Sequence, residues 1–120
     1  IWKKRVDICR DSFVRNGWMK KLQLLEGNDK HSNDSFLPPA ERNKLRKQLF
    51  EEFTDVIIDI KTAGNGVNLD DLSLCLLCLL KVNNTTISKC MGASENAIRT
   101  RKSRLKEKLD PLMYQFIFSR

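Results

Sequence analysis

The chain has 120 residues, of which 41% are hydrophobic and 31% are charged, a balance typical of a globular protein and not of a disordered one. Five Gly and three Pro exclude collagen-like and Pro-rich classes. Lys and Arg number 22 against 15 Asp and Glu, so the net charge is +7. This excess predicts a polyanionic partner, either a nucleic acid or an acidic membrane surface. The longest apolar run, Leu74 to Leu80, is far shorter than the roughly 20 residues of a membrane-spanning helix.

The chain begins without Met and shows no signal peptide. We therefore expect a piece from the C-terminal end of a longer protein, with any sensor or membrane anchor upstream. The cysteines, Cys9, Cys75, Cys78 and Cys90, lie mostly in apolar helical patterns, where a thiol packs as a small hydrophobic group. We interpret them as buried structural thiols of a cytoplasmic protein, and we expect no metal, redox site or cofactor.

Residues 1–26 form a predicted helix with two successive apolar faces. The first face contains Trp2, Val6, Cys9 and Phe13, and the second contains Val14, Trp18, Leu22 and Leu25. The two faces point in different directions on a 3.6-residue wheel. A kink at Gly17 would explain the change, and so would a second subunit packed on one face.

Residues 27–37 are polar turn formers and are predicted to form a loop. A second helix is predicted to begin at Pro38-Pro39 and to continue to Ile60. Its apolar stripe contains Leu45, Leu49, Phe50, Phe53, Val56, Ile57 and Ile60, and its opposite side carries Arg42, Lys44, Arg46, Lys47, Glu51, Glu52 and Asp55. Residues 63–66, Ala-Gly-Asn-Gly, are interpreted as a turn because no phosphate-loop sequence follows them.

Three helical segments with short turns follow, and no strand pattern occurs, so the predicted fold class is all-α. Asn68 caps the first segment, 69–81, which is apolar almost all round and must be central. Asn83 caps the second, 84–91, which Gly92 ends in the left-handed conformation. Ser94 caps the third, 94–109, which ends before Pro111. Residues 112–118 are too apolar for a free tail, so they are expected to pack on the core or on a partner.

The third segment concentrates the positive charge, with six bases and one acid between residues 99 and 108. Ile98, Leu105 and Leu109 face inward on the helical wheel. The outer side carries Asn96, Arg99, Thr100, Ser103 and Lys106. Arg can hydrogen-bond to guanine, Asn to adenine, and Ser or Thr to either. The Lys and Arg side chains that flank this outer side can contact the phosphates. Together with the short capped helix and the Gly turn before it, this pattern predicts a helix-turn-helix.

Residues 69–109 resemble the LuxR/GerE helix-turn-helix domain. Residues 83–92, NNTTISKCMG, match the family's "SNKEIA..LG" segment, residues 93–99 match its "IS..TVK", and residues 101–109 match its closing basic run ending in Lys-Leu. The match has no gap across the last two helices and covers about a third of the chain. Lys81 stands where the family usually has Gly, Asn83 where it has Ser or Thr, and Thr86 and Ser88 where it has Glu and Ala.

The resemblance implies an N-terminal helical pair, 1–66, that links or dimerises, and a DNA-binding domain, 67–120, of a bacterial transcriptional regulator. This part of the chain is also similar to the C-terminal ends of large regulators that carry tetratricopeptide repeats upstream. The base-facing residues would be Glu95, Asn96, Arg99, Thr100 and Ser103. The phosphate contacts would come from Lys81, Asn84, Thr85, Lys89, Arg101, Lys102, Arg104 and Lys106. Double-stranded DNA and a second copy of the chain are the implied partners, and RNA polymerase is a candidate partner.

Two other functions fit the same residues. The helix-turn-helix also resembles the promoter-reading domain of sigma factors, although residues 1–61 hardly supply the upstream domain that such a protein needs. A basic helix could instead bind an acidic protein or membrane face. We expect no enzymatic activity, because the single His31 lies in a predicted loop and no nucleophile–base pair or paired carboxylate site is evident.

Overall fold

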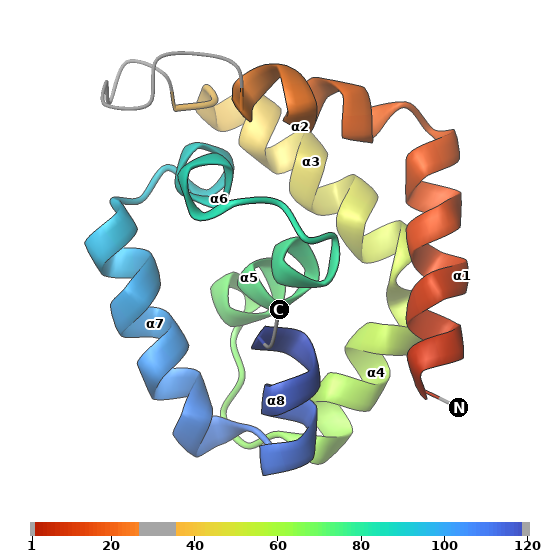
Figure 1. The fold of residues 1–120 in the computed structure, drawn as a ribbon, viewed down its shortest axis with the longest axis vertical. Coiled ribbons are helices and arrows are strands. Elements are labelled where there is room, and N and C mark those ends of the chain that lie inside the picture. The colour runs from red at the N-terminus through yellow and green to blue at the C-terminus, as the bar shows by residue number, and fades with distance from the viewer. Residues whose placement is uncertain (1, 27–35, 119–120) are drawn as a thin grey trace.

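The computed structural model describes residues 2–26 and 36–118, without the side chains of residues 24–26. This part of the chain contains eight helices and no strand, which confirms the all-α class (Figure 1). The helices are α1 (Trp2–Arg15), α2 (Trp18–Glu26), α3 (Pro39–Glu52), α4 (Thr54–Ala63), α5 (Leu69–Leu79), α6 (Asn84–Met91), α7 (Glu95–Lys108) and α8 (Pro111–Phe118). His31 and most of the predicted 27–37 loop lie outside the described residues.

Helix α5 lies at the centre of the molecule, as its sequence predicts. Every residue from Asp71 to Leu80 is buried. Helices α3, α6, α7 and α8 all pack against α5, and Figure 1 shows them arranged around it. A helix that is apolar on all sides can bury its surface only in such a position.

The predicted helix over residues 1–26 is two helices, α1 and α2, and the kink predicted at Gly17 is confirmed as a break at Asn16 and Gly17. Gly17 has φ +81°, a left-handed conformation that glycine adopts without steric cost. The Asn16 amide donates to the Glu52 carboxylate at the end of α3, 2.7 Å away, which ties the turn in place. On either side of the break, Phe13 and Leu22 are fully buried. The break turns the second apolar face so that Leu22 packs in the core, whereas Val14 stays 48% exposed and the side chain of Leu25 lies outside the described part of the chain.

The second predicted helix is also two helices, which meet at Phe53. Phe53 has φ −107° and ψ 26°, outside the helical region, and its ring is fully buried. The Thr54 hydroxyl donates to the backbone carbonyls of Phe50 and Glu51, at 3.0 and 3.1 Å. Side-chain bonds of this kind compete with the helical ladder. The stripe still forms one core surface, in which Leu45, Leu49, Phe53, Val56 and Ile60 are buried.

The predicted helix caps are confirmed. Asn68 and Asp71 form a capping box at the start of α5, with side-chain bonds of 2.8 and 3.1 Å to each other's backbone N–H groups. The Asn83 side chain accepts from the third residue of α6, and Ser94 does the same in α7. Gly92 ends α6 with φ +62°. These caps set where α5, α6 and α7 begin, and therefore how each turn is spaced.

The last helix, α8, packs against α5 and α7, so the apolar C-terminal residues join the core as predicted. Ile117 is buried, and the Phe116 ring contacts Trp2 edge to face with centroids 4.8 Å apart. Leu112 remains 76% exposed. Helices from residues 1–66 and 67–120 pack on one another, since α2 and α3 contact α6. None of the described helices is long and apolar enough to cross a membrane.

Candidate nucleic-acid interface

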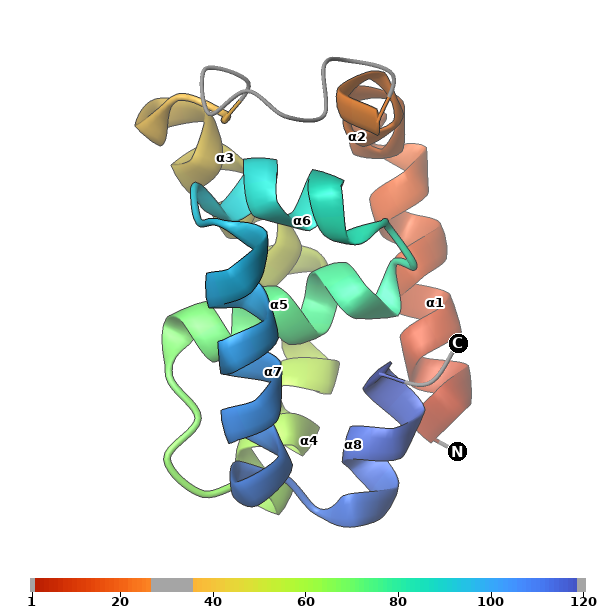
Figure 2. The ribbon, with the colours of Figure 1, turned by 60° about the vertical axis from the view of Figure 1, so that its left-hand side comes forward.

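Helices α6 and α7 form a tight pair across the turn at Gly92. The Ala93 N–H donates to the Ser88 carbonyl at 3.1 Å, and the Ser88 hydroxyl donates to the Ala93 carbonyl. Ile87 and Ile98 are both buried at the contact between the helices. Figure 2 shows α6 lying crosswise to α7, near the end where α7 begins. The described geometry is therefore that of two helices joined by a short turn, with α7 on the outside.

All five predicted base-facing residues are exposed on α7. They are Glu95, Asn96, Arg99, Thr100 and Ser103. The Arg99 guanidinium donates to the Asn96 side-chain oxygen at 2.6 Å, and the Thr100 hydroxyl donates to the Asn96 carbonyl at 3.0 Å. The first bond holds the Arg99 side chain along the helix while leaving its other N–H groups open. The face thus presents donors and acceptors that can meet the edges of bases.

The predicted phosphate contacts on α7 differ in their surroundings. Arg104 and Lys106 are exposed, and Lys102 donates to the Asn84 side chain at the start of α6, 2.9 Å away. The ammonium groups of Lys102 and Lys106 each lie 5.9 Å from an aromatic ring of α8. In the described chain, Arg99, Lys102, Arg104 and Lys106 form no ion pair, so their charge is available to an anion.

Arg101 has a different role because it binds Asp71, a buried acid of α5. Asp71 is 1% exposed and accepts from Arg101 at 3.1 Å and from Lys108 at 2.9 Å. Burial alone would raise the pKa of Asp71, but the hydrogen bonds from Lys108, the Asn68 N–H and Arg101 hold that pKa below its ordinary value. Asp71 thereby fixes one flank of α7 to the start of α5. The sequence pattern did not indicate this link between α5 and α7.

Lys89 and Lys81 occupy contrasting positions. Lys89 is only 2% exposed, because its side of α6 is packed against the rest of the chain, and the Leu37 N–H donates to its carbonyl at 3.0 Å. We leave Lys89 out of the interface. Lys81 is exposed on the turn after α5 with φ +63°. Asn84 is exposed and Thr85 half-buried at the start of α6.

Two arginines of α3 adjoin this region, although the sequence showed them only as part of a charged face. Arg42 donates to the Leu37 carbonyl at 2.7 Å, and its guanidinium lies so close to Gly92 that a Cβ there would be 2.6 Å from Nη1. Arg46 pairs with Asp70, and the same carboxylate lies 4.0 Å from Arg101. The amphipathic pattern of α3 indicated which residues point outward, but not that Arg42 lies beside Gly92 and Arg46 beside Asp70.

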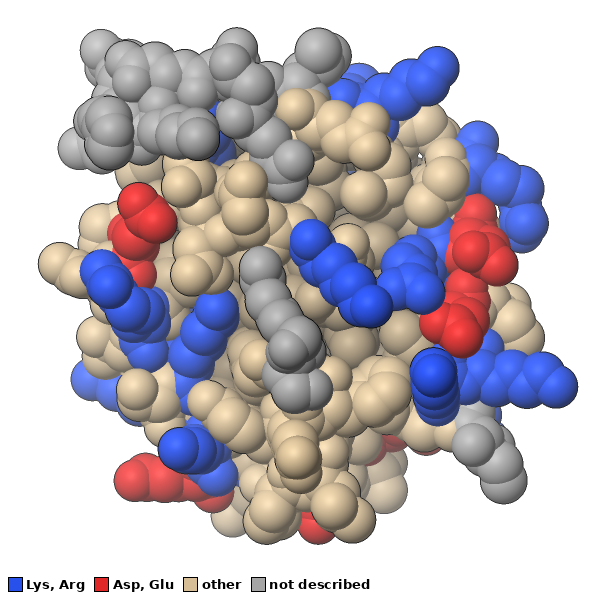
Figure 3. Space-filling view, in the orientation of Figure 1, with Lys and Arg blue, Asp and Glu red and all other residues tan. Residues whose placement is uncertain are grey.

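The basic character of the α7 surface is visible in Figure 3. Lys and Arg side chains gather at the left edge, where Figure 1 places α7, whereas basic and acidic side chains alternate at the right edge over α1. Acids are not absent from α7, since Glu95 and Glu107 are exposed there. In this view the basic side chains over α7 form one cluster, and further basic side chains lie near the centre and at the right edge.

The cysteines take no part in this surface. All four are buried as free thiols, which confirms that prediction. Burial raises the pKa of the Cys90 thiol to about 12, so the thiol is protonated at neutral pH. Within residues 2–26 and 36–118, no group of three His, Cys, Asp or Glu side chains is arranged to hold a metal ion.

Comparison with known proteins gives no relative for this chain. No protein family, no curated protein and no solved structure matches it. The geometry of α5, α6 and α7 and the chemistry of their side chains are accordingly the basis for any functional conclusion.

Proposed function

We propose that the chain binds double-stranded DNA through α6 and α7, as the DNA-binding part of a transcriptional regulator. The observation that carries the proposal is the outer face of α7. Exposed Asn96, Arg99 and Thr100 form its centre, and Arg104 and Lys106, which have no acidic partner in the described chain, lie beside it. Base-reading side chains flanked by cations are what a helix in the major groove needs.

Each helix has a distinct role in this proposal. Helix α7 enters the major groove, and α6 contacts the phosphates of one strand through Asn84 and Thr85 at its N-terminus, where unpaired backbone N–H groups favour an anion. The bond between Lys102 and Asn84 keeps these two contact regions together. Asp71 and Arg101 hold the other flank of α7, so that the outer face has a fixed orientation.

One copy of the chain would be only weakly selective. A good bidentate base contact contributes about 1–3 kcal/mol of discrimination, and α7 offers few of them. We propose that selectivity comes from two copies on half-sites about one helical turn apart. Mixing a long and a short form of the chain on one duplex, and counting bands of intermediate mobility in a gel shift, tests this stoichiometry.

The decisive experiment is fluorescence anisotropy of a labelled mixed-sequence duplex titrated with the chain at several salt concentrations. The proposal expects binding whose log K falls linearly with log salt, because phosphate contacts release counterions. Lys4→Ala is a control for the loss of one positive charge away from the proposed interface, and it should leave binding unchanged. Lys4 is exposed on α1, across the molecule from α7 (Figure 1). Absence of binding at low salt would contradict the proposal and favour an acidic protein as the partner of α7.

A further inference from the structure

Helix α7 has two different flanks. Arg101 and Lys102 lie on opposite sides of the buried stripe formed by Ile98 and Leu105, because successive residues of a helix are about 100° apart. Lys102 bonds to Asn84 of α6, whereas Arg101 contacts Asp70 and Asp71 of α5. The proposed phosphate contacts at the start of α6 therefore serve only the Lys102 flank.

On the Arg101 flank, a single carboxylate, that of Asp70, lies between Arg46 of α3 and Arg101 of α7. The Arg46 guanidinium pairs with Asp70 through its Nη2 atom, and the Asp70 carboxylate also lies 4.0 Å from Arg101. The Arg46 side chain is 38% exposed. Because a guanidinium carries five N–H donors in a planar fork, Arg46 keeps donors for a further anion.

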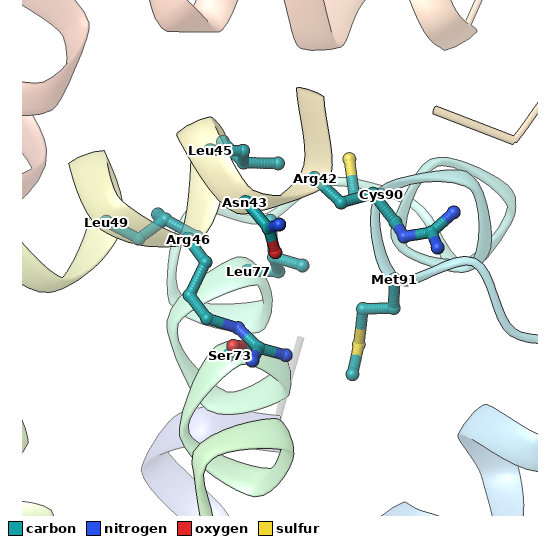
Figure 4. A pocket seen from close by; sticks show the side chains of 9 residues that line it. All are labelled: Arg42, Asn43, Leu45, Arg46, Leu49, Ser73, Leu77, Cys90 and Met91. Atoms are coloured by element: carbon teal, nitrogen blue, oxygen red, sulfur yellow. The ribbon is translucent and has the colours of Figure 1, made fainter. Parts of the chain in front are cut away.

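Arg46 also lines a small pocket between α3, α5 and α6. Its volume is about 60 Å³, enough for a group of a few atoms. Figure 4 shows Arg42 and Arg46 extending from α3 on either side of Asn43, with Ser73 of α5 and Met91 of α6 across from them. The deeper lining is apolar and includes Leu45, Leu49 and Leu77. Polar groups on one rim and an apolar floor suit a single oxyanion at the opening better than a long ligand.

The same flank continues along α7. A groove of about 340 Å³ lies between α7 and the start of α5, and Arg101, Arg104 and Lys108 line it. The Asp71 carboxylate offsets Arg101 and Lys108, but Arg104 forms no ion pair in the described chain. Arg46 and Arg104 thus supply positive charge on the side of α7 that is away from Asn84.

We infer that Arg46, with Arg42 beside it, is a second contact to the DNA backbone and takes the strand on the opposite side of the major groove from Asn84. This inference rests on the proposed function. A helix in the major groove has a phosphate strand on each side, and protein groups on both flanks fix its register. The region upstream of the helix-turn-helix then binds DNA itself and does more than connect domains.

The test compares the salt dependence of duplex binding by the 120-residue chain and by charge-matched variants. Arg46→Gln removes the proposed contact, whereas Lys47→Gln removes the same charge from an exposed neighbour on α3 that does not line the pocket. We expect the slope of log K against log salt to fall by about 0.9 for Arg46→Gln, as for one lost phosphate contact, and to stay unchanged for Lys47→Gln. Arg46→Lys should restore most of the slope.

Asp70→Asn provides a second test that does not remove an arginine. It deletes the carboxylate that competes with phosphate for Arg46, so duplex affinity should rise several-fold. Suppose that the wild-type chain binds the duplex but that Arg46→Gln and Lys47→Gln give the same salt slope, or that Asp70→Asn gives no gain in duplex affinity. Either outcome overturns the inference while the proposed function stands. A slope unaffected by Arg46→Gln, together with stabilisation by inorganic phosphate that Arg46→Gln abolishes, identifies a free-anion pocket and also overturns it. If the wild-type chain binds no duplex, the proposed function itself fails.

Discussion

The buried carboxylate of Asp71 accepts a hydrogen bond from the Arg101 guanidinium, which is 3.1 Å away in space and 30 residues away in the chain. The other Asp71 oxygen accepts from Lys108 at 2.9 Å and from the Asn68 N–H at 3.1 Å. A single acid thus completes the cap of α5 and fixes α7 at two positions, two turns apart. This contact therefore fixes the direction in which the outer face of α7 points.

Replacing Asp71 with Asn should destabilise the fold. Asn keeps the size of the side chain, but it loses the charge that offsets Arg101 and Lys108. Hydrogen bonds to charged groups each contribute about 1.5–3 kcal/mol, so we expect the free energy of unfolding to fall by about 2–4 kcal/mol. Urea denaturation followed by circular dichroism measures the change. Asp70→Asn, at an exposed neighbour, is the control and should cost less than about 1 kcal/mol. Equal losses for the two variants would contradict the assigned role of Asp71.

The lowered pKa of Asp71 predicts an acid-sensitive fold. The unfolded carboxyl has a pKa of about 3.9, and the folded one titrates below that. Between these two values the unfolded chain binds more protons, so stability contributed by Asp71 is full above about pH 5 and is lost as the pH falls through the folded pKa. The urea midpoint of the wild-type chain should therefore drop more steeply below pH 4 than that of Asp71→Asn. Parallel curves for the two proteins would argue against this linkage.

Lys81 predicts a stabilising substitution. Its φ of +63° is a left-handed conformation that costs an L-residue roughly 1–2 kcal/mol, and glycine avoids this cost but has more entropy when unfolded. Lys81→Gly should raise the free energy of unfolding by about 0.5–1 kcal/mol, seen as a higher Tm. Lys81→Ala removes the same charge but keeps the strain, so it should give no gain. A gain in both variants would point to the charge of Lys81 and not to its backbone.

Gly92 and Arg42 offer a test of the contact between α3 and the turn that joins α6 to α7. Gly92→Ala forces alanine into a left-handed backbone, φ +62°, and also places its Cβ against the Arg42 guanidinium. Gly66→Ala forces a similar backbone, φ +74°, but its Cβ points into open space. We expect Gly66→Ala to cost about 1 kcal/mol and Gly92→Ala about 1 kcal/mol more, because the flexible Arg42 guanidinium can move aside but then loses its hydrogen bond to the Leu37 carbonyl. Adding Arg42→Ala to Gly92→Ala should recover part of the excess. If the double variant recovers nothing, Arg42 is not what crowds the turn.

The sequence predicted the features that depend on neighbouring residues. Asn68, Asn83, Ser94 and Gly92 were identifiable because a cap acts within one turn of its own helix. The break at Phe53 was not, since Phe53 continues the apolar stripe and a threonine at position 54 does not by itself mark the end of a helix. In this chain, the helix caps were therefore predictable from neighbouring residues, whereas the break at Phe53 was not.

The candidate site divides in the same way. The outer face of α7 follows from its wheel, because Ile98 and Leu105 fix which side is buried. The burial of Lys89 does not follow from its own helix, since α2 and α3, which come from far upstream, pack against α6. The link from Arg46 through Asp70 to Arg101 likewise joins three helices and has no signature in any one of them.

Two substitutions on α7 should separate base reading from phosphate binding. Arg99 lies on the outer face beside Asn96, so Arg99→Ala should cost about 1–3 kcal/mol on the preferred site and much less on other duplexes, which relaxes sequence preference. Lys106 lies to one side, near the Tyr114 ring, so Lys106→Ala should weaken all duplexes alike and reduce the salt slope by about 0.9. Selection of a preferred site from a random duplex pool, followed by anisotropy on that site and on single-base variants, measures both effects. If Lys106→Ala instead changed the preference at one base pair, the two roles would be reversed, and α7 would lie in the groove rotated toward its Lys106 side.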